Sequence, residues 1–158
     1  MSVRAFIGLG SNLGNRAAHC TAAAAHLRRL RGTVLTRTSP LIETQPEDDV
    51  EGGPFLNGVA EIATTLPPDE LLVGLQAIET ALGRPSPHAR GKARTIDLDL
   101  LLYGDAVVQW PGLTVPHPRL GERRFVLEPL AAIAPEVRHP VLDLTAVELL
   151  ERLGTDRP

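Results

Sequence analysis

The chain of 158 residues is 43% hydrophobic and 22% charged, a balance typical of a folded globular domain. Its formal net charge of −3 argues against a general binder of nucleic acid or of an acidic membrane surface. The single cysteine, Cys20, excludes an intrachain disulfide, and no group of Cys and His residues has the spacing of a zinc site. We expect one domain over residues 1–158, since no linker or internal repeat divides the sequence.

The N-terminal residues and the apolar runs bear on location. Residues 1–4 lead directly into a strand-like segment, without the long apolar core of a signal peptide. No apolar run approaches the length that spans a bilayer. We therefore expect a cytoplasmic protein that does not associate with membranes.

Hydrophobic periodicity and turn residues predict the elements in chain order. These are a strand at 3–8, a helix at 16–30 capped by Asn15, strands at 33–38, 41–44 and 55–65, a helix from 67–68 to Gly83, a strand at 95–103, a hairpin return at 107–110, a helix at 123–132, and a helix at 145–153 capped by Thr145. Their order predicts an α+β fold of the split β-α-β, ferredoxin-like type. We expect an antiparallel sheet with helices packed mainly on one face, followed by C-terminal helical additions.

The sharpest feature lies within the strand predicted at 95–103. Alternation along a strand places Asp97 and Asp99 on one face, with Leu98 and Leu100 on the other. Neighbouring carboxylates repel each other, and a divalent cation relieves the repulsion. Magnesium prefers oxygen ligands and is commonly held by one or two carboxylates together with substrate phosphates. Taken alone, however, such a pair favours the simpler interpretation of an acidic, solvent-facing strand.

Basic residues crowd the segment in front of this strand. Arg94 lies three residues before Asp97, and the preceding loop carries four further basic side chains: Arg84, His88, Arg90 and Lys92. Cations beside a carboxylate pair are suited to receive a polyphosphate with its metal ions. An isolated basic run is usually a solvated loop. Because the two patterns adjoin in the sequence, we favour a polyphosphate site.

Six ordered blocks resemble the motifs of the 6-hydroxymethyl-7,8-dihydropterin pyrophosphokinases. They are G-S-N-L-G at 10–14, F-L-N at 55–57, Gln76 to Arg84 around the end of the second helix, R-T-I-D-L-D at 94–99, L-T-V-P-H-P-R at 113–119, and F-V-L-E-P-L at 125–130 after Arg123. They cover nearly the whole chain in the family's order and spacing. Some members have an arginine where Ser86 stands and a tryptophan where Gly91 stands, and Lys92 replaces a usual glycine or alanine. Part of the loop's contribution to ATP binding is therefore left open.

The resemblance implies transfer of a pyrophosphoryl group from ATP to the hydroxymethyl group of 6-hydroxymethyl-7,8-dihydropterin in folate biosynthesis, with release of AMP. It implies two Mg²⁺ ions at Asp97 and Asp99, a monomer, and no nucleic-acid partner. The catalytic residues it implies are Arg84, Arg94, Asp97 and Asp99. The ATP-binding residues it implies are Gln76, Glu79, Arg84, Arg90, Arg94, Leu100, Thr114, His117 and Arg123. The pterin-binding residues it implies are Gly10, Thr44, Gln45, Phe55, Asn57, Asp97 and Phe125.

Several of these residues also have a simpler interpretation. Phe55 and Phe125 are two of only three phenylalanines and offer flat surfaces for a bicyclic ring, but ordinary core packing would also account for them. His117 lies between two prolines, so it projects from a constrained loop, either towards ATP phosphate or simply at the surface. Gln76 and Glu79 share one helix face and on sequence alone are surface polar residues.

Two other classes of function remain open from the sequence. A metal-dependent nucleotidyl- or glycosyltransferase would also use the acidic pair, but it would not need Phe55 and Phe125. A non-enzymatic ligand-sensing module of ferredoxin-like fold would leave Asp97 and Asp99 as surface charges.

Overall fold

The computed structural model describes residues 1–45, 53–83 and 95–155, and every structural statement concerns these residues. The elements in chain order are β1 (Val3–Ser11), α1 (Arg16–Arg29), β2 (Thr33–Thr38), β3 (Ile42–Thr44), β4 (Phe55–Thr64), α2 (Pro68–Ala81), β5 (Asp97–Tyr103), β6 (Val108–Trp110), β7 (Leu113–Val115), the 3₁₀ helix η1 (Leu120–Glu122), α3 (Arg124–Ile133) and α4 (Ala146–Thr155). None of the helices in these ranges has the length and apolar character needed to cross a bilayer.

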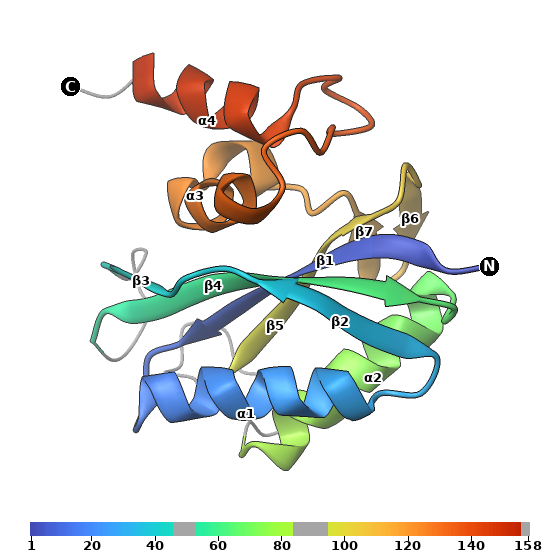
Figure 1. Cartoon of the computed structure of the whole chain (residues 1–158), viewed down its shortest axis with the longest axis vertical. Helices are drawn as coiled ribbons and strands as arrows, with labels where there is room; N and C mark the ends of the chain where they lie inside the picture. Colours follow the sequence, from blue (N-terminus) through green and yellow to red (C-terminus); the bar gives the residue numbers. More distant parts are fainter. Residues whose placement is uncertain (46–52, 84–94, 156–158) are drawn as a thin grey trace.

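The central sheet is antiparallel, with the strand order β2-β4-β1-β5 and with β3 also paired to β4 (Figure 1). Strand β4 therefore separates β1 from β2, and β1 separates β4 from β5. Each β-α-β unit is split by a strand of the other unit, which is the arrangement that the element order predicts. The predicted α+β class with an antiparallel sheet is confirmed.

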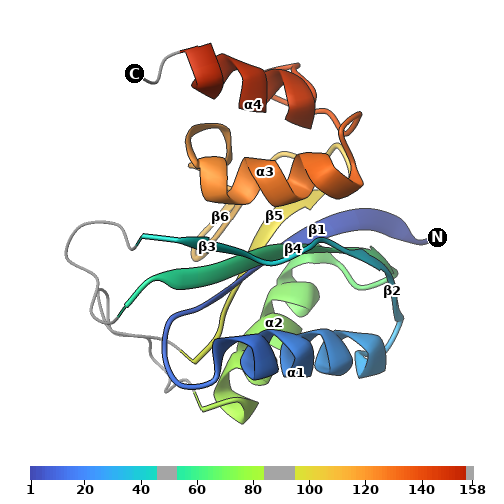
Figure 2. The same ribbon diagram turned by 60° about the vertical axis from the view of Figure 1, so that its left-hand side comes forward.

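Helices cover both faces of the sheet. Helices α1 and α2 lie on one face, whereas α3 lies on the opposite face with α4 stacked on it (Figures 1 and 2). The C-terminal additions thus form a third layer, and the expectation of helices mainly on one face is incomplete. Side-chain alternation in β1 supplies both cores, since Ile7 packs towards α1 and α2 and Phe6 packs towards α3 and α4. Burying each such side chain stabilises the fold by about 1.5–3 kcal/mol.

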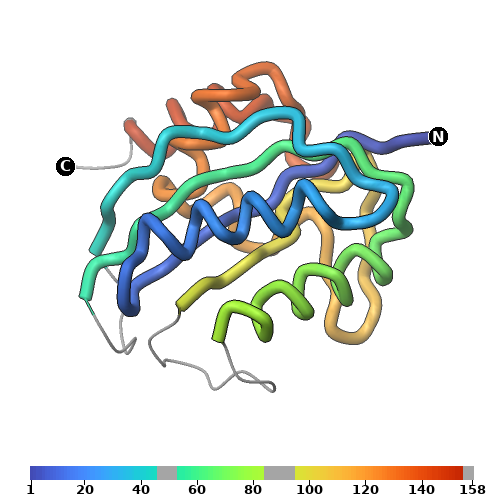
Figure 3. The backbone as a smooth tube through the Cα atoms, turned by 60° about the horizontal axis from the view of Figure 1, so that its bottom comes forward, coloured from blue at the N-terminus to red at the C-terminus, as the bar shows by residue number. Residues whose placement is uncertain are grey.

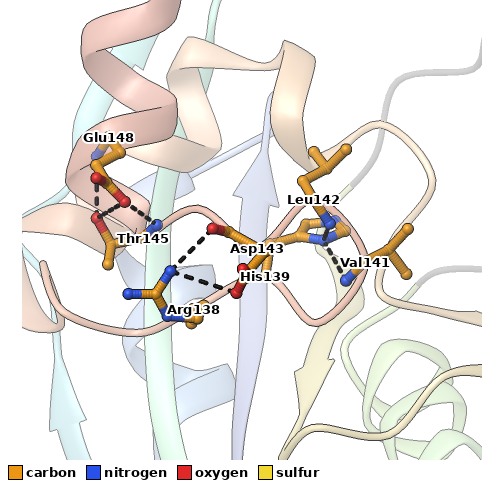
Figure 4. Close-up of polar contacts among 7 residues, drawn as sticks. All are labelled: Arg138, His139, Val141, Leu142, Asp143, Thr145 and Glu148. Atoms are coloured by element: carbon orange, nitrogen blue, oxygen red, sulfur yellow. Dashed lines mark hydrogen bonds and ion pairs between the residues drawn. The ribbon is translucent and has the colours of Figure 1, made fainter.

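The helix ends follow the predicted signals. The Asn15 side chain accepts a hydrogen bond of 3.1 Å from the amide of Ala18 and so caps α1. Helix α2 begins at Pro68, and the chain leaves it through Gly83, whose φ of +101° suits a residue without a Cβ. Thr145 caps α4, because its hydroxyl accepts from the amide of Glu148 at 3.2 Å while the Glu148 carboxylate accepts from the amide of Thr145 at 2.8 Å (Figure 4).

A histidine organises the turn that precedes α4. The Nδ1 atom of His139 accepts hydrogen bonds from the amides of Val141 at 3.1 Å and Leu142 at 3.0 Å (Figure 4). Burial, together with the charge of Arg152, lowers the pKa of His139. The neutral ring is therefore favoured, and its unprotonated Nδ1 remains an acceptor for this turn.

The segment predicted as a hairpin return onto the 95–103 strand pairs elsewhere, so this prediction is wrong. Strand β6 pairs with β7, and Gly112, with a φ of +78°, lies in the turn between them. Strand β7 was not predicted, and its only strand partner is β6. Strand β1 extends beyond its predicted end to Ser11, because β4 and β5 flank it on both sides.

Candidate active site

A pocket opens between the sheet and the start of α3. It is lined by residues of β1, β4 and β5, by the end of β3 and by the start of α3: Gly8, Leu9, Gly10, Thr44, Gln45, Phe55, Asn57, Gly58, Asp97, Asp99, Arg123, Phe125 and Val126. All seven residues expected to bind the pterin are among them. Some of them are more than a hundred positions apart in the sequence, and the fold brings them together.

Two glycines of β1 leave room on the floor of this pocket. Gly8 faces Asp99 and Gly10 faces Asp97 across the β1–β5 ladder. A Cβ added at Gly10 would lie 3.1 Å from Oδ1 of Asn57 and 3.6 Å from Cδ1 of Phe55. Any larger residue at position 10 would therefore crowd the pocket.

Asn57 is held in a fixed orientation by its neighbour. Its side chain is buried, and Nδ2 donates a hydrogen bond of 2.6 Å to Oγ1 of Thr44 on the adjacent strand. This bond directs Oδ1 towards Gly10, as the close approach at that position shows. The amide is therefore positioned in advance to hydrogen bond with the edge of a heterocycle.

The two phenylalanines come from different elements and meet at this pocket. Phe55 begins β4 and Phe125 lies in the first turn of α3, and both are only partly buried. The guanidinium carbon of Arg123 lies 5.4 Å from the centroid of the Phe125 ring, which is cation–π geometry. Both rings line the pocket, and Phe125 also packs against the core between the sheet and the C-terminal helices.

The acidic pair has the arrangement that alternation predicts. Asp97 and Asp99 are partly exposed in β5 and line the pocket, whereas Leu98 and Leu100 are buried in the core beneath. Within the described ranges no group of three or more His, Cys, Asp or Glu side chains is placed to hold a metal ion. Two carboxylates suit Mg²⁺ nevertheless, because this ion retains waters and takes its remaining ligands from phosphates. The donor set therefore fits the expected ion.

A second hollow adjoins the first and shares Asp99 with it. Its lining comes from α2, β5 and the β6–β7 region: Leu72, Leu98, Asp99, Leu100, Gly112, Leu113, Thr114, His117 and Pro118. Three residues expected to bind ATP, Leu100, Thr114 and His117, lie here. Arg123 lines the first pocket instead, and Gln76 is exposed on α2, one turn after Leu72. Asp99 thus lies where the two hollows meet.

A β-bulge anchors His117 beside Asp99. Phe6 pairs with Leu102 and Ile7 pairs with Leu100, so Leu101 has no opposite residue in β1. The carbonyl of Leu101 accepts a hydrogen bond of 2.9 Å from the amide of His117.

The ring of His117 is also oriented. Its Nδ1 accepts from the amide of Arg119 at 3.2 Å, and its Nε2 lies 4.0 Å from Oδ2 of Asp99. With Nδ1 acting as an acceptor, the proton of the neutral ring is on Nε2. That N–H can donate to an anionic group bound near Asp99.

Glu79 is buried, and its expected surface position is wrong. Its side chain accepts a hydrogen bond of 2.7 Å from the amide of Leu98, the residue between Asp97 and Asp99. Helix α2 runs alongside β5 at the edge of the sheet (Figure 3). An edge strand has backbone amides that no further strand satisfies, and the Glu79 carboxylate satisfies one of them. The sequence could not reveal this, because the amide comes into reach only when α2 packs on β5.

Three expected site residues, Arg84, Arg90 and Arg94, fall outside the described ranges. The positions at which the loop departs from the family pattern, Ser86, Gly91 and Lys92, fall outside them as well. In the first pocket, four lining residues were not predicted from the sequence: Gly8, Leu9, Gly58 and Val126. Gly8 had a usable signal, since it lies two positions before Gly10 and so shares its strand face.

Known proteins resemble this chain in sequence and in fold. The family model described as 7,8-dihydro-6-hydroxymethylpterin-pyrophosphokinase (HPPK) matches residues 6–135. A 2-amino-4-hydroxy-6-hydroxymethyldihydropteridine pyrophosphokinase of Pseudomonas aeruginosa is 42% identical over 140 residues, which cover 89% of this chain and 86% of that protein. The folic acid synthesis protein fol1 of Schizosaccharomyces pombe is 39% identical over 149 residues, 94% of this chain but only 20% of the longer protein.

The wild-type HPPK-DHPS of Plasmodium falciparum is similar in structure, with a TM-score of 0.76 and 17% identity over 96% of this chain and 45% of that one. At this identity the likeness concerns the fold. The chain thus spans about a fifth of the fungal relative and under half of the Plasmodium chain.

Proposed function

The chain belongs to the 7,8-dihydro-6-hydroxymethylpterin-pyrophosphokinase family, and on that premise we propose that it transfers the pyrophosphoryl group of ATP to 6-hydroxymethyl-7,8-dihydropterin and releases AMP, a step of folate biosynthesis. One observation carries this proposal. The seven residues expected to bind the pterin line one pocket, and that pocket shares Asp99 with a hollow containing three residues expected to bind ATP. This arrangement supports adjoining sites for the acceptor and the donor, with Asp99 where they meet and Asp97 beside it in the pterin pocket.

The first pocket suits a flat, polar, bicyclic ring system. Phe55 and Phe125 provide aromatic surfaces against which its rings stack. Asn57, oriented by Thr44, provides a carbonyl acceptor and a remaining N–H donor for the pyrimidinone edge. The hydroxymethyl group of the bound ring points towards Asp97 and Asp99.

The reaction requires alignment and charge neutralisation more than covalent participation of the protein. The hydroxymethyl oxygen forms a bond to the β-phosphorus of ATP, and the bond from that phosphorus to the α–β bridging oxygen breaks. AMP leaves with the bridging oxygen, and the hydroxyl proton passes to water. Nε2–H of His117 donates to a phosphate oxygen near Asp99, and Arg123 adds positive charge beside the pterin ring.

Asp97 and Asp99 are the residues that would hold Mg²⁺, and we propose two ions. When bound, these ions would neutralise phosphate charge and make the attacking hydroxyl more acidic. The proposed contributors to ATP binding also include Gln76 and Glu79 and, outside the described residues, Arg84, Arg90 and Arg94.

We also propose a cytoplasmic monomer formed by a single domain over residues 1–158, on the basis of family resemblance.

The nucleotide product tests the proposed reaction. Purified protein is incubated with ATP, Mg²⁺ and 6-hydroxymethyl-7,8-dihydropterin, and the nucleotides are separated by chromatography. We expect AMP that depends on the pterin. Formation of ADP, or pterin-independent turnover of ATP, would contradict the proposal and favour another transferase.

A further inference from the structure

Arg16 contacts both flanks of the segment that joins β3 to β4. It lies in the first turn of α1, where its Nη1 donates to the carbonyl of Pro54 at 2.8 Å. Its Nη2 forms an ion pair of 2.7 Å with Oε2 of Glu43. Asn12, just before the helix, makes a longer contact of 3.5 Å from Nδ2 to the carbonyl of Gly53. One side chain thus ties α1 to the residues on either side of this segment.

The residues that Arg16 contacts are direct neighbours of the pocket wall. Glu43 precedes Thr44, and Pro54 precedes Phe55. Thr44 and Phe55 face each other as the last pair of the β3–β4 ladder, and both line the pocket. Thr44 also accepts the hydrogen bond that orients Asn57. The position of this pair therefore decides the shape of the pocket and the direction of its amide.

The geometry distinguishes Arg16 from an ordinary surface charge. An exposed ion pair contributes little by itself, and the Glu43 side chain is 57% exposed. Arg16, in contrast, adds a charge-assisted bond to a main-chain carbonyl, which fixes the backbone before Phe55. A planar guanidinium holds two acceptors in a set relation, which a point charge on a flexible chain cannot do.

We propose that Arg16 is a positioning residue that fixes the Thr44–Phe55 wall and thereby determines the affinity for the pterin. This inference rests on the proposed function for the identity of the ligand. Arg16 does not line the pocket, so it acts through its two neighbours rather than by contact with the substrate. Its loss should weaken pterin binding while leaving the ATP side and the reacting groups in place.

The test compares Arg16→Met with Arg28→Met, which removes an exposed arginine from the same helix. We expect Arg16→Met to raise the KM for the pterin by about tenfold or more, the size of one lost hydrogen bond to a charged group. The KM for ATP and kcat should stay within about twofold of the wild-type values, the scatter expected for surface substitutions. Arg28→Met should change none of these constants. Equal pterin KM values for the two variants, or equal rises in both substrate KM values for Arg16→Met, would overturn the proposal.

Two further variants keep the test independent of any folding defect. Arg16→Lys retains a donor but cannot hold both partners, so an intermediate pterin KM is expected. Glu43→Gln should raise the pterin KM in the wild-type background and have a smaller effect added to Arg16→Met, since the two residues act together. Additive effects of the two substitutions on the pterin KM would contradict a joint action of Arg16 and Glu43.

A binding measurement separates this inference from the reaction itself. Pterin binding is measured by calorimetry with Mg²⁺ and α,β-methylene ATP, which cannot release AMP. If wild-type protein binds the pterin without ever producing AMP from ATP, the proposed function fails. The same comparison of dissociation constants then still decides the role of Arg16.

Discussion

Three carboxylates surround one short stretch of β5, and they serve two different tasks. Asp97 and Asp99 face the pocket, where they can hold a cation, whereas Glu79 is buried behind them against the backbone. The shared face of Asp97 and Asp99 could be predicted, because strand alternation alone places residues i and i+2 on one face. The burial of Glu79 could not be predicted, because it depends on the amide of Leu98 in β5, a different element from the helix that carries Glu79. The contacts of Arg16 could not be predicted for the same reason, since its partners lie 27 and 38 positions away in the sequence.

Glu79 should stabilise β5 through its hydrogen bond to Leu98. Glu79→Ala leaves that buried amide without this acceptor, so we expect the free energy of unfolding to fall by about 1–3 kcal/mol. Glu79→Gln keeps an acceptor oxygen and should lose less than half as much. Urea unfolding followed by circular dichroism measures both, with Gln76→Ala, an exposed residue on the same helix, as the control. The assignment is wrong if Glu79→Ala unfolds at the same urea concentration as Gln76→Ala.

At the scale of elements, long periodic segments were predictable, whereas the pairing of β6 and the existence of β7 were not. Helices α1 and α2 and strands β4 and β5 have enough residues for their periods to be read, and their caps and glycines mark their ends. Strands β6 and β7 have three residues each, so tertiary contact rather than local pattern decides their pairing. The bulge at Leu101 was equally hidden, yet it anchors the segment that carries His117.

Helix α4 offers a direct test of a predicted cap. Thr145→Ala removes the hydroxyl that accepts from the amide of Glu148, and we expect a loss of about 0.5–2 kcal/mol in the free energy of unfolding. Thr80→Ala is the matched control, because Thr80 is exposed within α2 and alanine favours the helix. Both are measured by chemical denaturation at neutral pH. An equal effect of the two substitutions would show that the capping box contributes nothing measurable.

At the scale of the whole molecule, the site depends on the third layer. Phe125 and Arg123 reach the pocket only because α3 packs on the face of the sheet opposite to α1 and α2 (Figure 2). Polar contacts reinforce this packing: Arg4 of β1 bonds to Glu136 at 3.0 Å, and Arg37 of β2 bonds to the carbonyl of Ile133 at 2.7 Å. The sequence predicted these C-terminal helices but not their face, because amphipathic helices do not specify which side of a sheet they cover.

The same region predicts a pH dependence of stability. Burial alone would raise the pKa of Glu61, but hydrogen bonds from Arg4 and Thr36 and the charges of Arg4 and Arg37 outweigh it and lower this pKa below its ordinary value. A carboxyl with a lowered pKa in the folded state stabilises the protein above its unfolded pKa, and this contribution is lost as the pH falls through the folded pKa.

The unfolding free energy should therefore fall in acid below about pH 4.5, the ordinary pKa of a glutamate. Glu61→Gln should reduce this slope, whereas Glu151→Gln, at an exposed position of α4, should leave it unchanged. Chemical denaturation at a series of pH values measures the effect. Parallel curves for the wild type and Glu61→Gln would contradict it.

The central claim is that Asp97 and Asp99 act where the first pocket, proposed to bind the pterin, adjoins the second hollow, proposed to bind ATP. The most direct measurement is pterin-dependent AMP release by Asp99→Ala beside Asp105→Ala, which removes an exposed aspartate just beyond β5. We predict a loss of at least about a hundredfold for Asp99→Ala with the fold intact by circular dichroism, since charge stabilisation at the reacting phosphates would be removed. Near wild-type AMP release by a folded Asp99→Ala protein would contradict the account.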